Sequence, residues 1–258
     1  MLILLSPAKQ LDFTPAPAPL VTQPVLAGRT RVLARTTRAL SQGDIKALMD
    51  LSDDLARLNR ERFQAFDPDA PGSQPAAFAF AGEVYRGLDA RSLSHEDLEW
   101  AQDRLRILSG LYGVLRPLDA IQPYRLEMGT RLRTRSGATL YDFWRDDIAK
   151  SLKRDLEGQA APAVVNLASQ EYARAARLSS LGAPVISVDF KEEKDGQLRA
   201  LMVFAKKARG MMARWIIENR IEDPESLTRF DCDGYRLAER DDRTGALLFT
   251  RPQPAKRD

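Results

Sequence analysis

The chain has 258 residues, of which 44% are hydrophobic and 29% charged, and its formal net charge is +3. These values are ordinary for a globular protein and exclude a low-complexity or strongly charged disordered chain. A single histidine and a single cysteine argue against a His/Cys metal site and exclude an internal disulfide. No apolar run is long enough to span a bilayer, so we expect a cytoplasmic protein with no membrane partner, no metal and no cofactor.

The first hundred residues predict one buried strand followed mainly by helices. Leu2–Leu5 is a continuous apolar run that ends at Ser6-Pro7, which is typical of a central strand. Residues 13–24 are rich in proline and predict an extended loop. Helical periodicity follows at residues 32–40 and 44–66, and residues 77–80 predict a short strand. A capping box at Ser94 begins a helix whose apolar spacing continues to Leu108.

The second half alternates strands and helices. Helices are expected at residues 142–156, from Ser169, and at 206–220, and strands at 163–167, 185–190 and 198–204. Asp195-Gly196 predicts a hairpin turn between the last two strands. A terminal hairpin is expected at 235–238 and 246–249, with fraying after residue 250. The pattern predicts an α+β (mixed α/β) fold in one domain, residues 1–258, with a mixed β-sheet flanked by helices.

Residues 104–135 contain seven arginines, no lysine and two acidic residues, with glycines at Gly110 and Gly113. Arginine presents paired donors to phosphate oxygens, and glycine lets backbone N–H groups approach an anion. This pattern favours a phosphate-binding helix–hairpin–helix element at about residues 98–124, which would contact a DNA backbone. Alternatively, the glycines form a simple turn and the arginines solvate a surface, and the sequence leaves both interpretations open.

Polar residues also follow the predicted strands, and ligand sites form beyond the carboxyl ends of parallel strands. These residues are expected around one pocket: Ser6, Lys9, Asn166, Ser169, Glu171 and Lys206. Lys207 and Arg209 follow the same predicted strand as Lys206. Ser169 and Glu171 have nucleophilic or acid–base chemistry, and Lys206 could hold an anion, so these three are the catalytic candidates. The alternative is structural, with Ser169 as a helix cap, Asn166 as a turn residue and the lysines exposed.

Long stretches of the chain carry a family resemblance. They are LILLSPAK at residues 2–9, LSGLYGVLRPLDAIQPYRLEMG at 108–129, VVNLASQEY at 164–172 and AKKARGMMARWIIENRI at 205–221, with LYDFW at 140–144 and FDCDGY at 230–235. On these stretches the chain resembles the YaaA (UPF0246) family of peroxide stress proteins along nearly its whole length. It differs mainly in the proline-rich residues 14–24 and the arginine-rich residues 131–135.

The resemblance implies a cytoplasmic bacterial protein of the hydrogen peroxide response, associated with lower intracellular free iron. It also implies a helix–hairpin–helix element and a positively charged cleft that binds double-stranded or branched DNA without sequence specificity. Carried over by position, the cleft would use Lys9, Arg116, Arg125, Lys206, Lys207 and Arg209; the arginine–glycine segment adds Arg106, Gly110, Gly113 and Arg131. Because the carboxylates show no ligand spacing, we expect any effect on iron to be indirect.

Two functional hypotheses follow from the sequence. The first is a DNA-binding stress protein without enzymatic activity. The alternative is an enzyme that acts on a small phosphorylated, nucleotide or carboxylate substrate in the strand-end pocket, since three polar strand ends are more than DNA binding requires. Ser6, Asn166, Ser169 and Lys206 around one closed pocket too narrow for a duplex would favour the alternative. Wide separation of these four residues would remove its basis.

Overall fold

The structure is a computed structural model that describes residues 1–254 except residues 17 and 19. Its strands are β1 (Leu2–Leu5), β2 (Gln10–Leu11), β3 (Gln74–Pro75), β4 (Phe80–Ala81), β5 (Leu105–Ser109), β6 (Gly113–Leu115), β7 (Ala120–Ile121), β8 (Val164–Asn166), β9 (Val185–Lys194), β10 (Gln197–Arg199), β11 (Arg236–Arg240) and β12 (Leu247–Pro252). Its helices are α1 (Ala27–Arg38), α2 (Gln42–Met49), α3 (Asp53–Ala65), α4 (Ala76–Ala79), α5 (Glu83–Leu88), α6 (His95–Arg104), α7 (Leu140–Trp144), α8 (Asp147–Glu157), α9 (Gln170–Ala176) and α10 (Met202–Glu218).

A mixed eight-stranded sheet runs through the molecule in the order β11-β12-β9-β8-β1-β5-β6, with β10 beside β9. The central strands β5, β1, β8 and β9 are parallel, and β12 pairs in parallel with β9. All four residues of β1 are fully buried, as a parallel strand covered on both faces requires. The expected mixed α/β fold with a mixed sheet and flanking helices is therefore confirmed.

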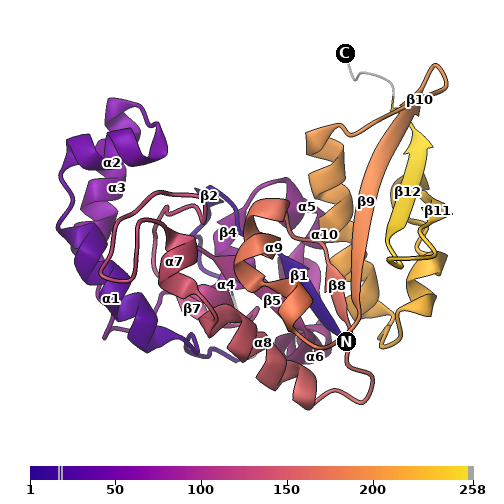
Figure 1. Cartoon of the computed structure of the whole chain (residues 1–258), viewed down its shortest axis with the longest axis horizontal. Coiled ribbons are helices and arrows are strands. Elements are labelled where there is room, and N and C mark those ends of the chain that lie inside the picture. The colour runs from indigo at the N-terminus through magenta and orange to yellow at the C-terminus, as the bar shows by residue number, and fades with distance from the viewer. Residues whose placement is uncertain (17, 19, 255–258) are drawn as a thin grey trace.

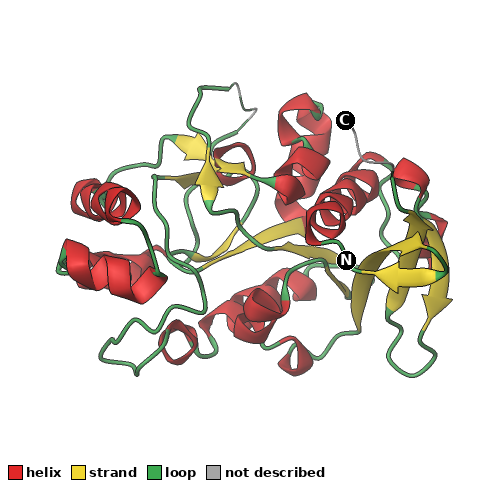
Figure 2. Cartoon of the chain, turned by 90° about the horizontal axis from the view of Figure 1, so that it is seen from above, coloured by secondary structure: helices red, strands yellow, loops and turns green. Residues whose placement is uncertain are grey.

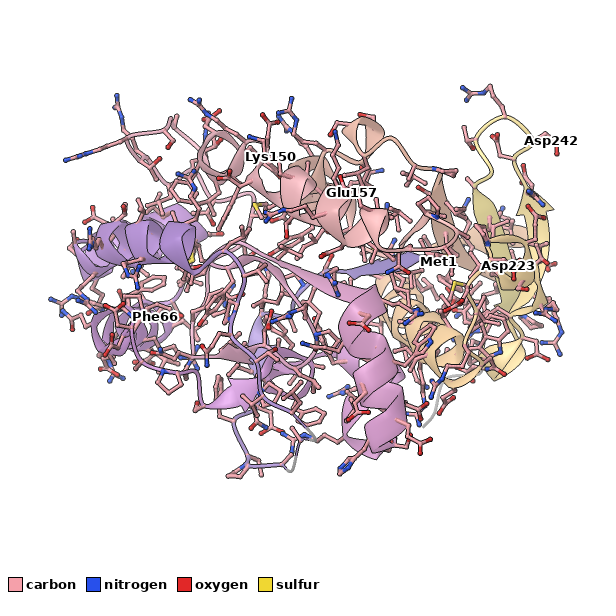
Figure 3. The ribbon with its side chains drawn as sticks, turned by 90° about the horizontal axis from the view of Figure 1, so that it is seen from below. Met1, Phe66, Lys150, Glu157, Asp223 and Asp242 are labelled. Atoms are coloured by element: carbon pink, nitrogen blue, oxygen red, sulfur yellow. The ribbon has the colours of Figure 1, made fainter. Side chains whose placement is uncertain are left out.

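Helices cover both faces of the sheet (Figure 2). On one face α10 packs against α5, α6 and the strands β1 and β9, while α9 packs against β5 and α8 against β6 on the other. In Figure 3, Lys150 and Glu157 mark α8 on one side of the strand that starts at Met1, and α6 lies on the opposite side. Phe66 lies toward one end of the molecule and Asp223 and Asp242 toward the other.

Two groups of elements project from the central body in Figure 1. Helices α1, α2 and α3 form one. The other is the hairpin of β9 and β10, with α10 running back beside it. Asn166, the last residue of β8, pairs with Ser187, so β9 continues for seven residues, or roughly 23 Å, beyond the end of β8. The hairpin therefore rises at the carboxyl ends of the central strands.

The helix–hairpin–helix expected at residues 98–124 is not confirmed. Helix α6 ends at Arg104, and residues 105–109 form the fully buried strand β5, which pairs with β6 in a β-hairpin. Residues 118–124 contain β7 and no helix. A strand that is buried on both faces lacks the alternation of apolar and polar residues that marks a half-buried strand. Leu105 and Leu108 of β5 also continue the helical spacing of α6, so the sequence could not distinguish a strand from a longer helix here.

Several other boundaries differ from the prediction. The predicted helix at 44–66 is two helices separated at Asp50, which has a left-handed φ of 49°, and the one at 142–156 is broken at Arg145, with φ 42°. Residues 76–79 are helical, and the predicted strand at 198–204 is β10 followed by the start of α10. The predicted fraying is wrong for Arg251 and Pro252, which belong to β12, and residues 255–258 lie outside the described part.

Candidate functional site

The carboxyl ends of β1 and β8 bring two predicted pocket residues into contact. Pairing of Leu4 with Asn166 places Ser6 beside Ser169. The Ser169 amide donates to Ser6 Oγ at 2.9 Å, and the two hydroxyl oxygens are 3.3 Å apart. Asn166 lies at the end of β8, where its Oδ1 accepts from the Ala168 amide at 3.1 Å. The Asn166 side chain therefore shapes the turn between β8 and α9, as in the structural alternative.

Four tyrosine and serine side chains, not singled out in the sequence, surround these strand ends. Tyr85 on α5 donates its hydroxyl to the Ser6 carbonyl at 3.0 Å. Ser109, at the end of β5, shares a hydrogen bond of 2.6 Å with the Tyr124 hydroxyl. Tyr172 on α9 is buried as well. These residues become candidates for the site only because the fold brings them together. In the sequence they are far apart, and tyrosines at such positions are usually ordinary core residues.

Burial is the main cause that raises the pKa of each of these tyrosines. Proximity to Tyr124 and Tyr172 raises the pKa of Tyr85 further, and Tyr124 and Glu171 do the same for Tyr172. The pKa of Tyr124 is also raised chiefly by burial. The hydroxyls are therefore neutral at physiological pH and serve as hydrogen-bond donors and acceptors.

Charged residues adjoin this hydroxyl group. Glu171 Oε1 accepts from the Gly129 amide at 2.7 Å, which fixes the loop after β7 against α9. In the same loop Glu127 pairs with Lys9 through Oε2 at 3.1 Å and with Arg125 through Oε1 at 3.0 Å. Carboxylates, hydroxyls and cations from separate segments thus meet at one edge of the sheet, an arrangement that can bind a polar ligand and move protons.

The predicted phosphate-binding residues fall into two groups in the structure. Arg106 is 4% exposed, and its guanidinium binds Asp155 and backbone carbonyls, so it stabilises the fold. Arg116 pairs with the buried Asp119 at 2.8 Å. Arg131, in contrast, is exposed and forms no ion pair within the described residues.

Gly110 and Gly113 are buried and serve packing. A Cβ at Gly110 would lie 2.2 Å from the Leu126 carbonyl oxygen, and one at Gly113 would lie 2.8 Å from Trp144. Gly113 also has a φ of 74°, a conformation that favours glycine. Trp144 Nε1 donates to the Gly110 carbonyl at 3.0 Å. These glycines form a close-packed β-hairpin turn, which corresponds to the structural alternative.

The cations expected after a strand at 198–204 lie on helix α10 instead. Lys206 is exposed and makes no hydrogen bond or ion pair in the part of the chain that the structure describes. Lys207 lies 3.7 Å from Asp233, and Arg209 lies 3.7 Å from Asp189 on β9. Burial lowers the pKa of Arg209. No group of three or more potential metal-ligating side chains gathers among the described residues.

The mixed sheet and the polar side chains beyond its strands define the class of protein: an α/β protein with a polar site at the carboxyl ends of its central parallel strands. The family model described as peroxide stress protein YaaA matches residues 1–241. The chain belongs to this family.

Curated relatives of the same family cover nearly the whole chain. An UPF0246 protein of Maricaulis maris is 63% identical over 257 residues, covering 99% of this chain and 97% of the relative. An UPF0246 protein of Caulobacter vibrioides is 56% identical over 255 residues, covering 98% of this chain and all of the relative. One of Phenylobacterium zucineum is 54% identical over 256 residues, covering 98% and 96%. No helix among the described residues has the length and apolar character needed to cross a membrane.

Proposed function

We propose that this peroxide stress family member acts in the cytoplasm by binding the backbone of double-stranded or branched DNA without sequence specificity. Protection of DNA would be its contribution to the peroxide response, and the association with lower free iron would follow indirectly. The observation that carries the proposal is a set of exposed arginines without carboxylate partners in one loop. Such cations are available to phosphates, whereas paired ones must first give up their partner.

The loop holds Arg131, Arg133 and Arg135, all of them exposed. None forms an ion pair with any described residue, in contrast to the paired Arg116 and Arg125 earlier in the same segment. The loop is fixed to α7, because Arg145 Nη2 donates to the Ser136 carbonyl at 3.1 Å. Three free guanidinium groups on an anchored loop favour contacts with successive phosphates.

Helices α2 and α3 follow each other after a short connection and pack together, as in a helical hairpin, but we do not assign backbone binding to this pair. The first turn of α3 carries Asp53 and Asp54, which are exposed at the positive end of the helix. Lys46 and Arg57 are paired with these two aspartates. The carboxylates would repel a phosphate, so the arginine loop is the better candidate for binding DNA.

Fluorescence anisotropy with a labelled duplex, measured over a series of salt concentrations, tests the proposal. Neutralising the loop should lower the slope of log affinity against log salt by up to about 0.9 for each phosphate that no longer binds a guanidinium group. A control with the same change of charge removes three exposed arginines at the other end of the molecule and should leave the slope unchanged. The test variant is Arg131→Gln/Arg133→Gln/Arg135→Gln, and the control is Arg229→Gln/Arg236→Gln/Arg243→Gln. Affinity that barely changes with salt, or equal weakening in both variants, would refute the proposal.

The contact between Ser6 and Ser169 favours a second candidate, an activity on a small phosphorylated, nucleotide or carboxylate ligand at the strand ends. Ser169 and Glu171 would act on the ligand, and the neutral tyrosines would donate hydrogen bonds to it. Thermal stabilisation by a panel of such compounds tests this candidate. Ser169→Ala and Glu171→Gln should abolish stabilisation by the active compound without changing duplex affinity. A panel without any stabilising compound would count against it.

A further inference from the structure

We propose that the outer face of helix α8 is a second contact surface for the phosphates of a DNA duplex and continues the surface formed by the arginine loop, residues 131–135. The cations of this second surface are Lys150, Lys153 and Arg154, all of them exposed. The proposal rests on the proposed function, because it assigns further residues to the binding of the same duplex.

Helix α8 presents its three cations together on the side that faces solvent. Its opposite side, which includes Leu152 and Leu156, is at most 4% exposed at these two leucines, and the helix packs against β6 and α9. Residues three and four positions apart lie on one face of an α-helix, so Lys150, Lys153 and Arg154 share an arc of roughly 100°. The rise from Lys150 to Arg154 is roughly 6 Å, close to two base-pair steps of a duplex.

The fold removes most of the negative charge from this face. Residues 146–157 contain four acidic and three basic residues, so their sequence does not predict a basic surface. Each aspartate of this segment pairs with an arginine of another element: Asp146 with Arg177, Asp147 with Arg29 at 2.8 Å, and Asp155 with Arg106 at 2.7 Å. The three cations themselves form no ion pair with any described residue. Three positive charges and the single negative charge of Glu157 therefore remain on the outer face.

Helix α8 lies on the same side of the molecule as the arginine loop. The chain passes from the loop into α7, and only Arg145 and Asp146 separate α7 from α8. Arg145 Nη2 donates to the Ser136 carbonyl at 3.1 Å and so fixes the loop to this segment. In Figures 1 and 3 the loop before α7, α7 and α8 follow one another along one side of the molecule, and Lys150 marks α8 in Figure 3. A duplex that contacts the loop can therefore continue over α8.

The outer face of α8 fits a nucleic-acid backbone better than a membrane surface. A helix that binds a membrane inserts an apolar face among the lipids and places its cations beside that face. In α8 the apolar face is already buried within the protein, and none of the described residues of this helix exposes a large apolar side chain. Phosphates of a duplex require only accessible cations, which the outer face supplies.

Fluorescence anisotropy with a labelled duplex, measured over a series of salt concentrations, tests the proposal. The α8 variant, Lys150→Gln/Lys153→Gln/Arg154→Gln, should lower the slope of log affinity against log salt by up to about 0.9 for each phosphate contact that is lost. Lys150→Arg/Lys153→Arg retains the charges and should keep the slope of the wild type. The control with the same change of charge, Arg229→Gln/Arg236→Gln/Arg243→Gln, should also keep it.

Thermal denaturation shows whether weaker binding of the α8 variant arises from misfolding. Within the described part of the chain, the only hydrogen bond from these three side chains is that of Arg154 Nε to the Lys150 carbonyl, at 3.4 Å in the same helix. The α8 variant loses no other partner, so its Tm should stay within about 2 °C of the wild type.

Glu157 provides a test of the opposite sign. Its carboxylate is exposed and lies four residues after Lys153, on the same face of α8. A phosphate bound to this face would be repelled by the carboxylate. Glu157→Gln should therefore raise duplex affinity about twofold, the size expected for one exposed charge interaction. Equal or lower affinity of Glu157→Gln would count against a phosphate on this face.

Comparison with the loop variant, Arg131→Gln/Arg133→Gln/Arg135→Gln, separates this surface from the proposed function. A lower slope in the loop variant alone would overturn the α8 surface and leave the proposed function standing. A lower slope in the α8 variant alone would support the α8 surface and remove the loop from the proposed function. Affinity that does not depend on salt in the wild type would refute both.

Two further measurements test the continuity of the surface and the class of partner. At saturation, one duplex bound to each chain supports a single surface that includes the loop and α8. Two duplexes for each chain, one of which the α8 variant removes, would overturn it. Binding to phosphatidylglycerol vesicles that the α8 variant abolishes, with unchanged duplex affinity, would overturn DNA as the partner of α8.

Discussion

Two glycines allow helices α5 and α10 to approach each other along their backbones, and replacing one of them has a calculable effect. A Cβ at Gly210 would lie 1.8 Å from the Val84 carbonyl oxygen, and one at Gly87 would lie 2.0 Å from the Lys207 carbonyl oxygen. Ordinary contacts begin at 3.4 Å, and a backbone oxygen cannot rotate away. Gly210→Ala must therefore push the helices apart, which we expect to destabilise the protein by about 3 kcal/mol, the upper end for overpacking.

Thermal denaturation with Gly28→Ala as the control measures this effect. For a protein of this size, about 3 kcal/mol corresponds to a decrease of roughly 6–12 °C in Tm. A Cβ at Gly28, in the first turn of α1, meets no atom within 4 Å. Gly28→Ala should raise the stability by about 0.5 kcal/mol, because alanine favours the helix. A Gly210→Ala protein as stable as the wild type would show that the two helices separate freely and would refute the reasoning.

Two further predictions concern Arg106 and Cys232. Arg106→Met should lower the free energy of unfolding by about 3 kcal/mol, since Asp155 is left without its partner, and should leave the salt dependence of DNA binding unchanged. Burial, followed by the nearby Asp231, raises the pKa of the Cys232 thiol. Iodoacetamide should therefore alkylate Cys232 more slowly than free cysteine at pH 7, with the rate rising only at higher pH; an equal rate would contradict this.

The central strands of the sheet were predictable from short apolar runs in the sequence. The proximity of the polar residues that follow these strands was predictable as well. The apolar runs at β1 and β8 are ended by polar residues, and parallel pairing of such strands places those residues together. Ser6 and Ser169 are 163 residues apart in the chain, yet the pattern alone indicates their proximity. The tyrosines were not predictable, because their hydroxyls matter only through partners such as the Ser6 carbonyl and Ser109.

Lys206 and the arginine–glycine segment show where local patterns fail. The residues from Leu198 to Phe204 have strand-forming side chains, but Met202 already begins α10, whose stability comes from its contacts with α5. Likewise, Leu105 and Leu108 continue the spacing of α6 although they belong to β5. Tertiary packing selects between helix and strand in both cases, and a local pattern contains no information about it.

The seven arginines of residues 104–135 illustrate why charge counted along a sequence differs from charge available at a surface. Asp155, which lies 49 residues after Arg106, removes that arginine from the surface, and the buried Asp119 pairs with Arg116. Arg131, Arg133 and Arg135, in contrast, form no ion pair with any described residue and stay exposed.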